Sequence, residues 1–118
     1  MGLDIGFYKD GEAIFDLRNH DEFLRLFFQQ NVKRVHSEYT DFHVDFRVLN
    51  GVSEALREEF RKHSLTVADI PEEVPATFWD LDARATPWET MLPFYPLLVQ
   101  ILRRELYKRG RLICSWSA

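Results

Sequence analysis

Apolar and polar residues alternate on both sides of an Asp10-Gly11 dipeptide, which is the pattern of a β-hairpin. A two-residue loop would pair Lys9 with Glu12 and would mix apolar with charged side chains on one face. A three-residue loop, 9–11, pairs Ile5 with Phe15. It puts six apolar side chains on one face: Leu3, Ile5, Phe7, Ala13, Phe15 and Leu17. Because burial selects the register with one apolar face, we predict the three-residue loop, with Gly11 in a left-handed conformation.

A helical pattern follows the hairpin directly. Phe23 and Phe27, and likewise Leu24 and Phe28, lie four residues apart, so they form an apolar stripe wide enough to cover the hairpin. The helix begins with a capping signal, in which Asn19 is the expected N-cap and Glu22 completes the box.

The middle of the chain predicts one strand, one helix and an irregular segment. Residues 41–49 alternate between polar and apolar, so we expect a half-buried strand that ends at Asn50-Gly51. Ser53 is placed to cap a short helix that ends near His63. The apolar stripe of this helix is Val52, Leu56 and Phe60, and its outer face is charged. Residues 64–85 show no periodicity, and we expect a long loop there.

The C-terminal third predicts two helices and a strand. The segment Thr86-Pro87-Trp88-Glu89 has the pattern of a capped helix start, with Thr86 as the cap. Pro93 and Pro96 follow too soon for one undisturbed helix, so a short turn should precede a second helix. That helix ends at Gly110, and residues 111–116 form the last strand. The apolar face of the second helix is Tyr95, Leu98, Ile101, Leu102 and Leu106.

The element order β-β-α-β-α-α-β predicts a single α+β domain over residues 1–118. We expect a mainly antiparallel sheet of about four strands, with helices packed on one face. The strand order does not follow from the pattern. The length of 118 residues suits one domain, and 46% hydrophobic residues, with 14% aromatic, exclude disorder for most of the chain.

Charge and cysteine content narrow the function classes. A net charge of −4 argues against general nucleic-acid binding, which requires a basic face. The single cysteine, Cys114, excludes an intrachain disulfide and fits a reducing compartment; its alternation with core residues indicates a buried, inert thiol. There is no apolar run of about 18 residues and no signal-peptide pattern, so we expect no membrane partner and a cytoplasmic location.

Two short motifs carry a family resemblance. The chain starts with MGLD, followed by the aromatic-lysine sequence Phe7-Tyr8-Lys9, and the second hairpin strand ends in LRNH where it opens a helix. In these features the chain resembles small uncharacterised phage and prophage proteins. The resemblance covers residues 1–9 and 17–28 and is weaker at 44–56 and 114–116. It implies a phage-related origin and a compact α+β fold, and it implies no activity.

Asp41, His43 and Asp45 fall on one face of the expected third strand, with about 6.6 Å between successive positions. Carboxylates bind hard metal ions and imidazole widens the choice of metal, so these side chains are candidate metal ligands, with His36 and Glu38 close by in the sequence. The simpler interpretation, which we favour, is a polar strand face in water, because this spacing matches no dedicated ligand motif.

A segment rich in aromatic and acidic residues is the candidate partner-binding surface. It contains Phe78, Trp79, Asp80, Asp82 and Trp88. Aromatic side chains ringed by charge are typical of binding surfaces, where a few residues carry most of the energy. The two aspartates could also bind magnesium or a cationic group, although acid pairs in loops more often stay in water or cap a turn.

Arg18, Asn19 and His20 lie where the second strand meets the first helix, a position that suits anion binding by helix amides. The structural alternative is that Asn19 caps the helix while Arg18 pairs with Asp4 or Asp16. Capping alone would account for Asn19.

We therefore expect a small binding protein without a cofactor, acting on a host or defence protein through the aromatic-acidic surface. The chain has no catalytic signature, in which a nucleophile or metal would stand beside a positioned base. One alternative is a metal-assisted hydrolase that uses Asp41, His43 and Asp45, or Asp80 and Asp82. An acidic immunity-type inhibitor is a further alternative.

Overall fold

The computed structural model of the chain describes residues 3–31 and 41–117. Its four strands are β1 (Asp4–Lys9), β2 (Glu12–Arg18), β3 (Phe42–Val44) and β4 (Leu112–Ser117). They form one sheet in the order β2-β1-β4-β3, and every neighbouring pair is antiparallel. The C-terminal strand thus lies in the middle of the sheet, beside the first strand of the chain.

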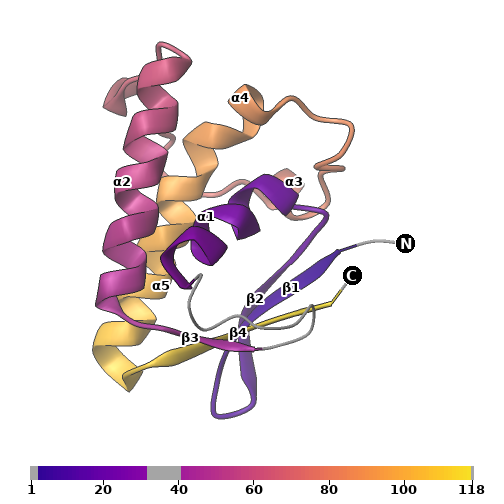
Figure 1. Ribbon diagram of the computed structural model, residues 1–118. Coiled ribbons are helices and arrows are strands. Elements are labelled where there is room, and N and C mark those ends of the chain that lie inside the picture. The colour runs from indigo at the N-terminus through magenta and orange to yellow at the C-terminus, as the bar shows by residue number, and fades with distance from the viewer. Residues whose placement is uncertain (1–2, 32–40, 118) are drawn as a thin grey trace.

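The helices pack against this sheet, and the predicted α+β fold is confirmed (Figure 1). The α-helices are α1 (Asp21–Asn31), α2 (Phe46–Lys62), α3 (Ala76–Trp79), α4 (Trp88–Met91) and α5 (Tyr95–Arg109). Two short 3-10 turns are η1 (Val67–Asp69) and η2 (Leu92–Phe94). The two longest helices, α2 and α5, run side by side, and α1 also packs against α2.

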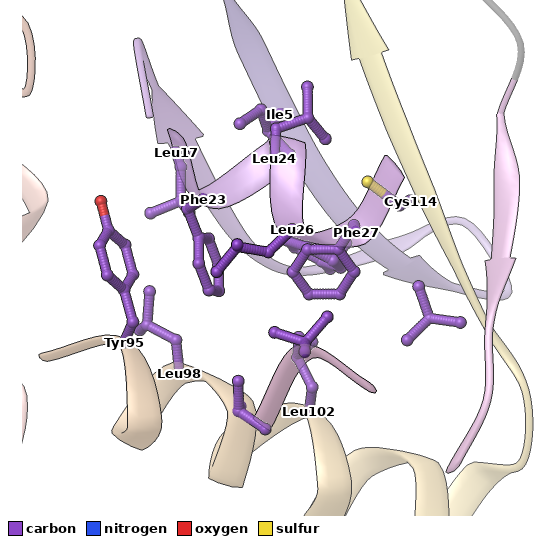
Figure 2. Packing of buried hydrophobic residues seen from close by; sticks show 14 of the residues in the cluster. Ile5, Leu17, Phe23, Leu24, Leu26, Phe27, Tyr95, Leu98, Leu102 and Cys114 are labelled. Atoms are coloured by element: carbon purple, nitrogen blue, oxygen red, sulfur yellow. The ribbon is translucent and has the colours of Figure 1, made fainter. Parts of the chain in front are cut away.

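Side chains from α1, α5 and the sheet gather in one core, as Figure 2 shows. The core is rich in aromatic rings. Phe27 lies 5.1 Å from Phe7 of β1, centroid to centroid, and Phe23 stacks on Tyr95 of α5 at 4.2 Å. All four of these side chains are fully buried. The predicted stripe of α1 therefore links the hairpin to the C-terminal helix.

The hairpin has a two-residue turn, so the predicted three-residue loop is wrong. Lys9 pairs with Glu12, and both turn residues have positive φ, 51° at Asp10 and 82° at Gly11. Positive φ at both central positions is the property of a type I′ turn, whose twist matches that of the flanking strands. The predicted left-handed conformation of Gly11 is confirmed.

A bulge reconciles this turn with the apolar face. Tyr8 pairs with Ala13 but Phe7 pairs with Phe15, so Ile14 is the extra residue. The shift brings Phe15 and the residues after it onto the same side as Phe7, and the buried face predicted for 5, 7, 15 and 17 is confirmed. Ala13, which precedes the bulge, is exposed.

Asn19 does not cap α1, which begins two residues later at Asp21. Its backbone has a φ of 63°, and its side-chain Oδ1 accepts a hydrogen bond from the Leu3 amide at 2.9 Å. The Asn19 amide in turn donates to the Leu3 carbonyl at 2.7 Å. The residue thus ties the end of β2 to the start of β1, and this tertiary pairing replaces the local cap.

The predicted strand over 41–49 is correct only as far as Val44. Asp45 is the N-cap of α2, and its carboxylate accepts a hydrogen bond from the Val48 amide at 2.9 Å. The helix then continues through Asn50-Gly51, the predicted end of the strand, and past Ser53, the predicted helix cap, so both predictions are wrong. The reason is a longer apolar stripe, since Val48 and Leu49 extend the predicted one and are buried.

The C-terminal predictions are confirmed except at the start of α4 and at Ile101. Pro87 stands at its N-cap position, whereas the Thr86 hydroxyl donates to the carbonyl of Asp82 at 2.7 Å. The turn at η2 and the restart at α5 are as expected, and α5 ends at Gly110, where φ is 83°. Ile101 is only half-buried, and Val99 takes the core position beside Leu98 and Leu102.

Candidate binding groove

The three candidate metal ligands near β3 do not converge. His43 points outward from a three-residue strand and is exposed, as is Asp41, while Asp45 is engaged as the cap of α2. Among residues 3–31 and 41–117, no group of three or more His, Cys, Asp or Glu side chains is placed to hold a metal ion. His36 and Glu38 lie outside the described residues.

The three residues of the candidate anion site at the start of α1 each have a different structural role. Arg18 forms an exposed ion pair with Asp4, with 3.8 Å between Nε and Oδ1. Asn19 ties the two strands together, and His20 is buried in the core with 3% of its surface exposed. The structure therefore does not present these side chains to one anion.

His20 instead forms a buried polar pair with Tyr95. Its Nδ1 lies 2.7 Å from the Tyr95 hydroxyl, which also lies 3.6 Å from the sulfur of Met91. The centroids of the His20 and Phe78 rings are 5.4 Å apart. Burial lowers the pKa of His20 to about 4, an effect that Asp21 only partly offsets, and burial raises the pKa of Tyr95. At neutral pH the pair is uncharged, and it joins the start of α1 to the start of α5.

The aromatic-acidic segment divides between core and surface. Phe78 is 2% exposed and belongs to the core, and the half-buried Trp88 donates its Nε1 hydrogen to Glu59 at 2.8 Å. Trp79 is 42% exposed, and Asp80 beside it is also exposed. Asp82 is exposed but accepts from the Arg84 amide at 3.1 Å, closing a local turn. As an interaction surface the segment stays a prediction, which now rests mainly on Trp79 and Asp80.

Trp79 also lines a polar hollow of about 510 Å³ that includes outward-facing residues of β1 and β2. Gly6 leaves room for the ring of Tyr8, since a Cβ at this position would come within 2.4 Å of it. The Tyr8 hydroxyl donates to Asp16 at 3.4 Å. Burial, followed by Asp16 and more distant carboxylates, raises the pKa of Tyr8. The hollow carries charges of both signs, because Arg18 lies in it beside Asp4 and Asp16.

A second hollow, of similar volume but apolar, lies between α2 and α5. We call it the α2–α5 groove; its volume is about 510 Å³, and the segment around η1 forms its third wall. The apolar side chains that line it come from all three walls: Leu56, Phe60, Leu65, Val67, Ile70, Pro96 and Val99. Val67 is 81% exposed and stands at the rim, whereas Leu56, Phe60 and Val99 are buried and form the floor.

The charged side chains that line the groove are all arginines, namely Arg57, Arg61 and Arg103. Arg103 reaches from α5 to α2, where its Nη1 donates to Asn50 at 2.8 Å and its Nη2 donates to the Ser53 hydroxyl at 2.9 Å. These partners are neutral, so they hold the guanidinium in place without cancelling its charge. The groove therefore combines an apolar floor with a rim whose charged side chains are all arginines.

The sequence pattern did not identify this groove, because its walls are distant along the chain. Arg57 and Arg61 belong to the charged outer face of α2, and Arg103 lies near the middle of α5. The one local signal is the sequence Leu65-Thr66-Val67, which places apolar residues in an otherwise irregular segment. An exposed Val67 beside Leu65 becomes meaningful only once η1 is placed against the two helices.

Comparison with family models, with curated proteins and with solved structures gives no match for this chain. None of the described helices has the length and apolar character that crossing a membrane requires. Function is therefore inferred from the geometry of the described residues.

Proposed function

We propose that this chain is a non-enzymatic binding protein that holds an apolar segment of a partner protein in the α2–α5 groove. The observation that supports this function is the continuous apolar surface from the floor, at Leu56 and Phe60, to the exposed Val67 at the rim. Isolated exposed apolar side chains are ordinary, but a contiguous apolar patch with a polar border is typical of an interaction site.

The dimensions of the groove suit this role. A volume of about 510 Å³ lies within the usual range of binding sites, roughly 300–1,000 Å³. Burying apolar surface contributes about 25 cal/mol per Å², so a partner that covers Val67 and reaches the floor gains affinity from this contact. The floor is preformed by helices that also build the core, so binding requires little rearrangement.

The phage-related origin that the family resemblance implies supports a host or defence protein as the partner. Trp79 and Asp80 offer a second contact surface, in line with the expectation for the aromatic-acidic segment. A metal-assisted hydrolase gains no support among the described residues, because Asp45 is engaged as a helix cap and the other candidate ligands point into solvent.

Site-specific photo-cross-linking tests the proposal. A photoreactive amino acid at Val67 should cross-link a host protein in a lysate, whereas the same group at Tyr107, which is 84% exposed on α5 and does not line the groove, should not. A second variant, Gln100→Trp, adds a large ring at an exposed position in the groove wall and should abolish the cross-link. Equal products from positions 67 and 107, or a product that persists in Gln100→Trp, would show that the groove is not the binding site.

A further inference from the structure

We infer that the partner segment held by the α2–α5 groove is an amphipathic helix with acidic residues flanking its apolar face. This inference rests on the proposed function and adds the chemistry of the partner. It is carried by three observations: the sign of the charges at the rim, the fixed position of Arg103, and the direction of the groove along α2.

The rim favours carboxylates because its charged residues have one sign. Arg57 and Arg61 pair with Glu54 and Glu58 on the same helix, and those two glutamates do not line the groove. Exposed ion pairs of this kind contribute little to stability, because water and salt screen them. An incoming carboxylate can therefore compete for either guanidinium, whereas a basic segment would find no carboxylate among the residues that line the groove.

Arg103 is the fixed positive group of the groove. A guanidinium has five N–H donors, and the bonds to Asn50 and Ser53 use two of them. No acidic side chain in the described part of the chain forms an ion pair with Arg103. Because its geometry is already set, a partner carboxylate gains a charge-assisted hydrogen bond with little further loss of side-chain entropy.

The groove follows α2 from Ser53 to Arg61, a length of about 12 Å at 1.5 Å per residue. Apolar residues at i, i+3 or i+4, and i+7 of a partner helix span nearly the same distance. Leu56 and Phe60 lie four apart on α2, so the floor has the spacing of a helix surface. A helix also satisfies its own backbone hydrogen bonds, and the walls of the groove are helices and turns that offer no strand edge to an extended segment.

Binding of two designed peptides to the full chain tests this inference. Both are capped 14-residue helices with leucine at i, i+3, i+7 and i+10; one carries glutamate beside this stripe and the other carries lysine at the same positions. Fluorescence anisotropy should show the acidic peptide binding at least about tenfold more tightly than the basic one at low salt. The Gln100→Trp variant should lose this binding.

Matched substitutions on α5 locate the charge effect. Arg103→Gln should weaken binding of the acidic peptide about tenfold. Arg104→Gln, the same change at an exposed neighbour outside the groove, should leave the affinity for this peptide unchanged. Thermal melts show whether Arg103→Gln still folds. The double variant Arg57→Gln/Arg61→Gln removes two exposed charges from the rim and should weaken binding without affecting the core.

Several outcomes would overturn the inference. Equal groove-dependent binding of the acidic and basic peptides would leave the proposed function standing and refute acidic selectivity. An equal loss in the Arg103 and Arg104 variants would indicate general charge attraction. Binding of oleate, or groove-dependent dimerisation of the chain, without binding of the acidic peptide would assign the groove to a different occupant.

Discussion

The buried imidazole of His20 should make this protein sensitive to mild acid. The residue is 3% exposed, its Nδ1 is hydrogen-bonded to Tyr95, and aromatic rings surround it. Burial disfavours the imidazolium and lowers the pKa of His20 to about 4, against 6.5 for the unperturbed group. The unfolded chain therefore binds a proton in a pH range where the folded chain does not.

The sign and size of the effect follow from this difference in pKa. Because His20 is protonated more readily in the unfolded state, lowering the pH lowers the free energy of unfolding. The contribution of neutral His20 to this free energy is fully present above about pH 6.5, falls as the pH drops, and is lost near pH 4. At about 1.4 kcal/mol per unit of pKa, the loss between pH 7 and pH 4 is about 3 kcal/mol. This is a large share of the roughly 5–15 kcal/mol that holds a small domain folded.

Urea denaturation of wild type and His20→Phe over pH 4–7 measures this contribution. The phenylalanine keeps an aromatic ring but cannot titrate, so the difference between the two proteins removes the background from carboxylates. We expect the free energy of unfolding of wild type, relative to the variant, to fall by about 3 kcal/mol from pH 7 to pH 4. A flat difference, or an NMR titration in which His20 of the folded protein has a pKa near 6.5, would refute the reasoning.

Two other substitutions test the packing and the helix boundaries. Leu102→Ala should lower the free energy of unfolding by about 2–5 kcal/mol, because the side chain is fully buried on α5; a loss below about half a kcal/mol in urea melts would contradict that placement. Asp45→Ala removes the side-chain cap of α2 and should cost about 0.5–2 kcal/mol, while Asp41→Ala, at an exposed neighbour with no capping role, serves as the control.

The C-terminal third of the fold, from residue 86 onward, was predicted mainly from local patterns. Pro93 and Pro96 predict an interruption because proline lacks an amide hydrogen, and the helix restarts after it as expected. Gly110 has the positive φ that the end of a helix requires. Leu112 and Cys114 alternate with exposed Ile113, as expected for a strand with one buried face. In each case the deciding interaction lies within a few residues.

The sequence-based predictions are wrong where a local signal competes with a contact to another part of the chain. Asn19 has the chemistry of a helix cap, but its side chain bonds to Leu3, sixteen residues away. The strand pattern at 45–49 gave way to a helix because Asp45 caps it, and because Val48 and Leu49 join the stripe of α2. In the hairpin, the preferences of the turn and of the buried face were both satisfied by a bulge. A strict alternation of apolar and polar residues has no position for the extra residue of a bulge, so it does not predict one.

The sequence by itself determined the α+β class, the apolar face of α1 and most of that of α5, because these depend on periodicities within single segments. Only the tertiary structure decided the strand order, the burial of His20 against Tyr95 and the candidate groove. The three walls of that groove come from α2, η1 and α5, and Arg103 is fixed by residues about fifty positions earlier. Contacts between distant segments leave no spacing in the sequence, so they become visible only once the helices are placed against one another.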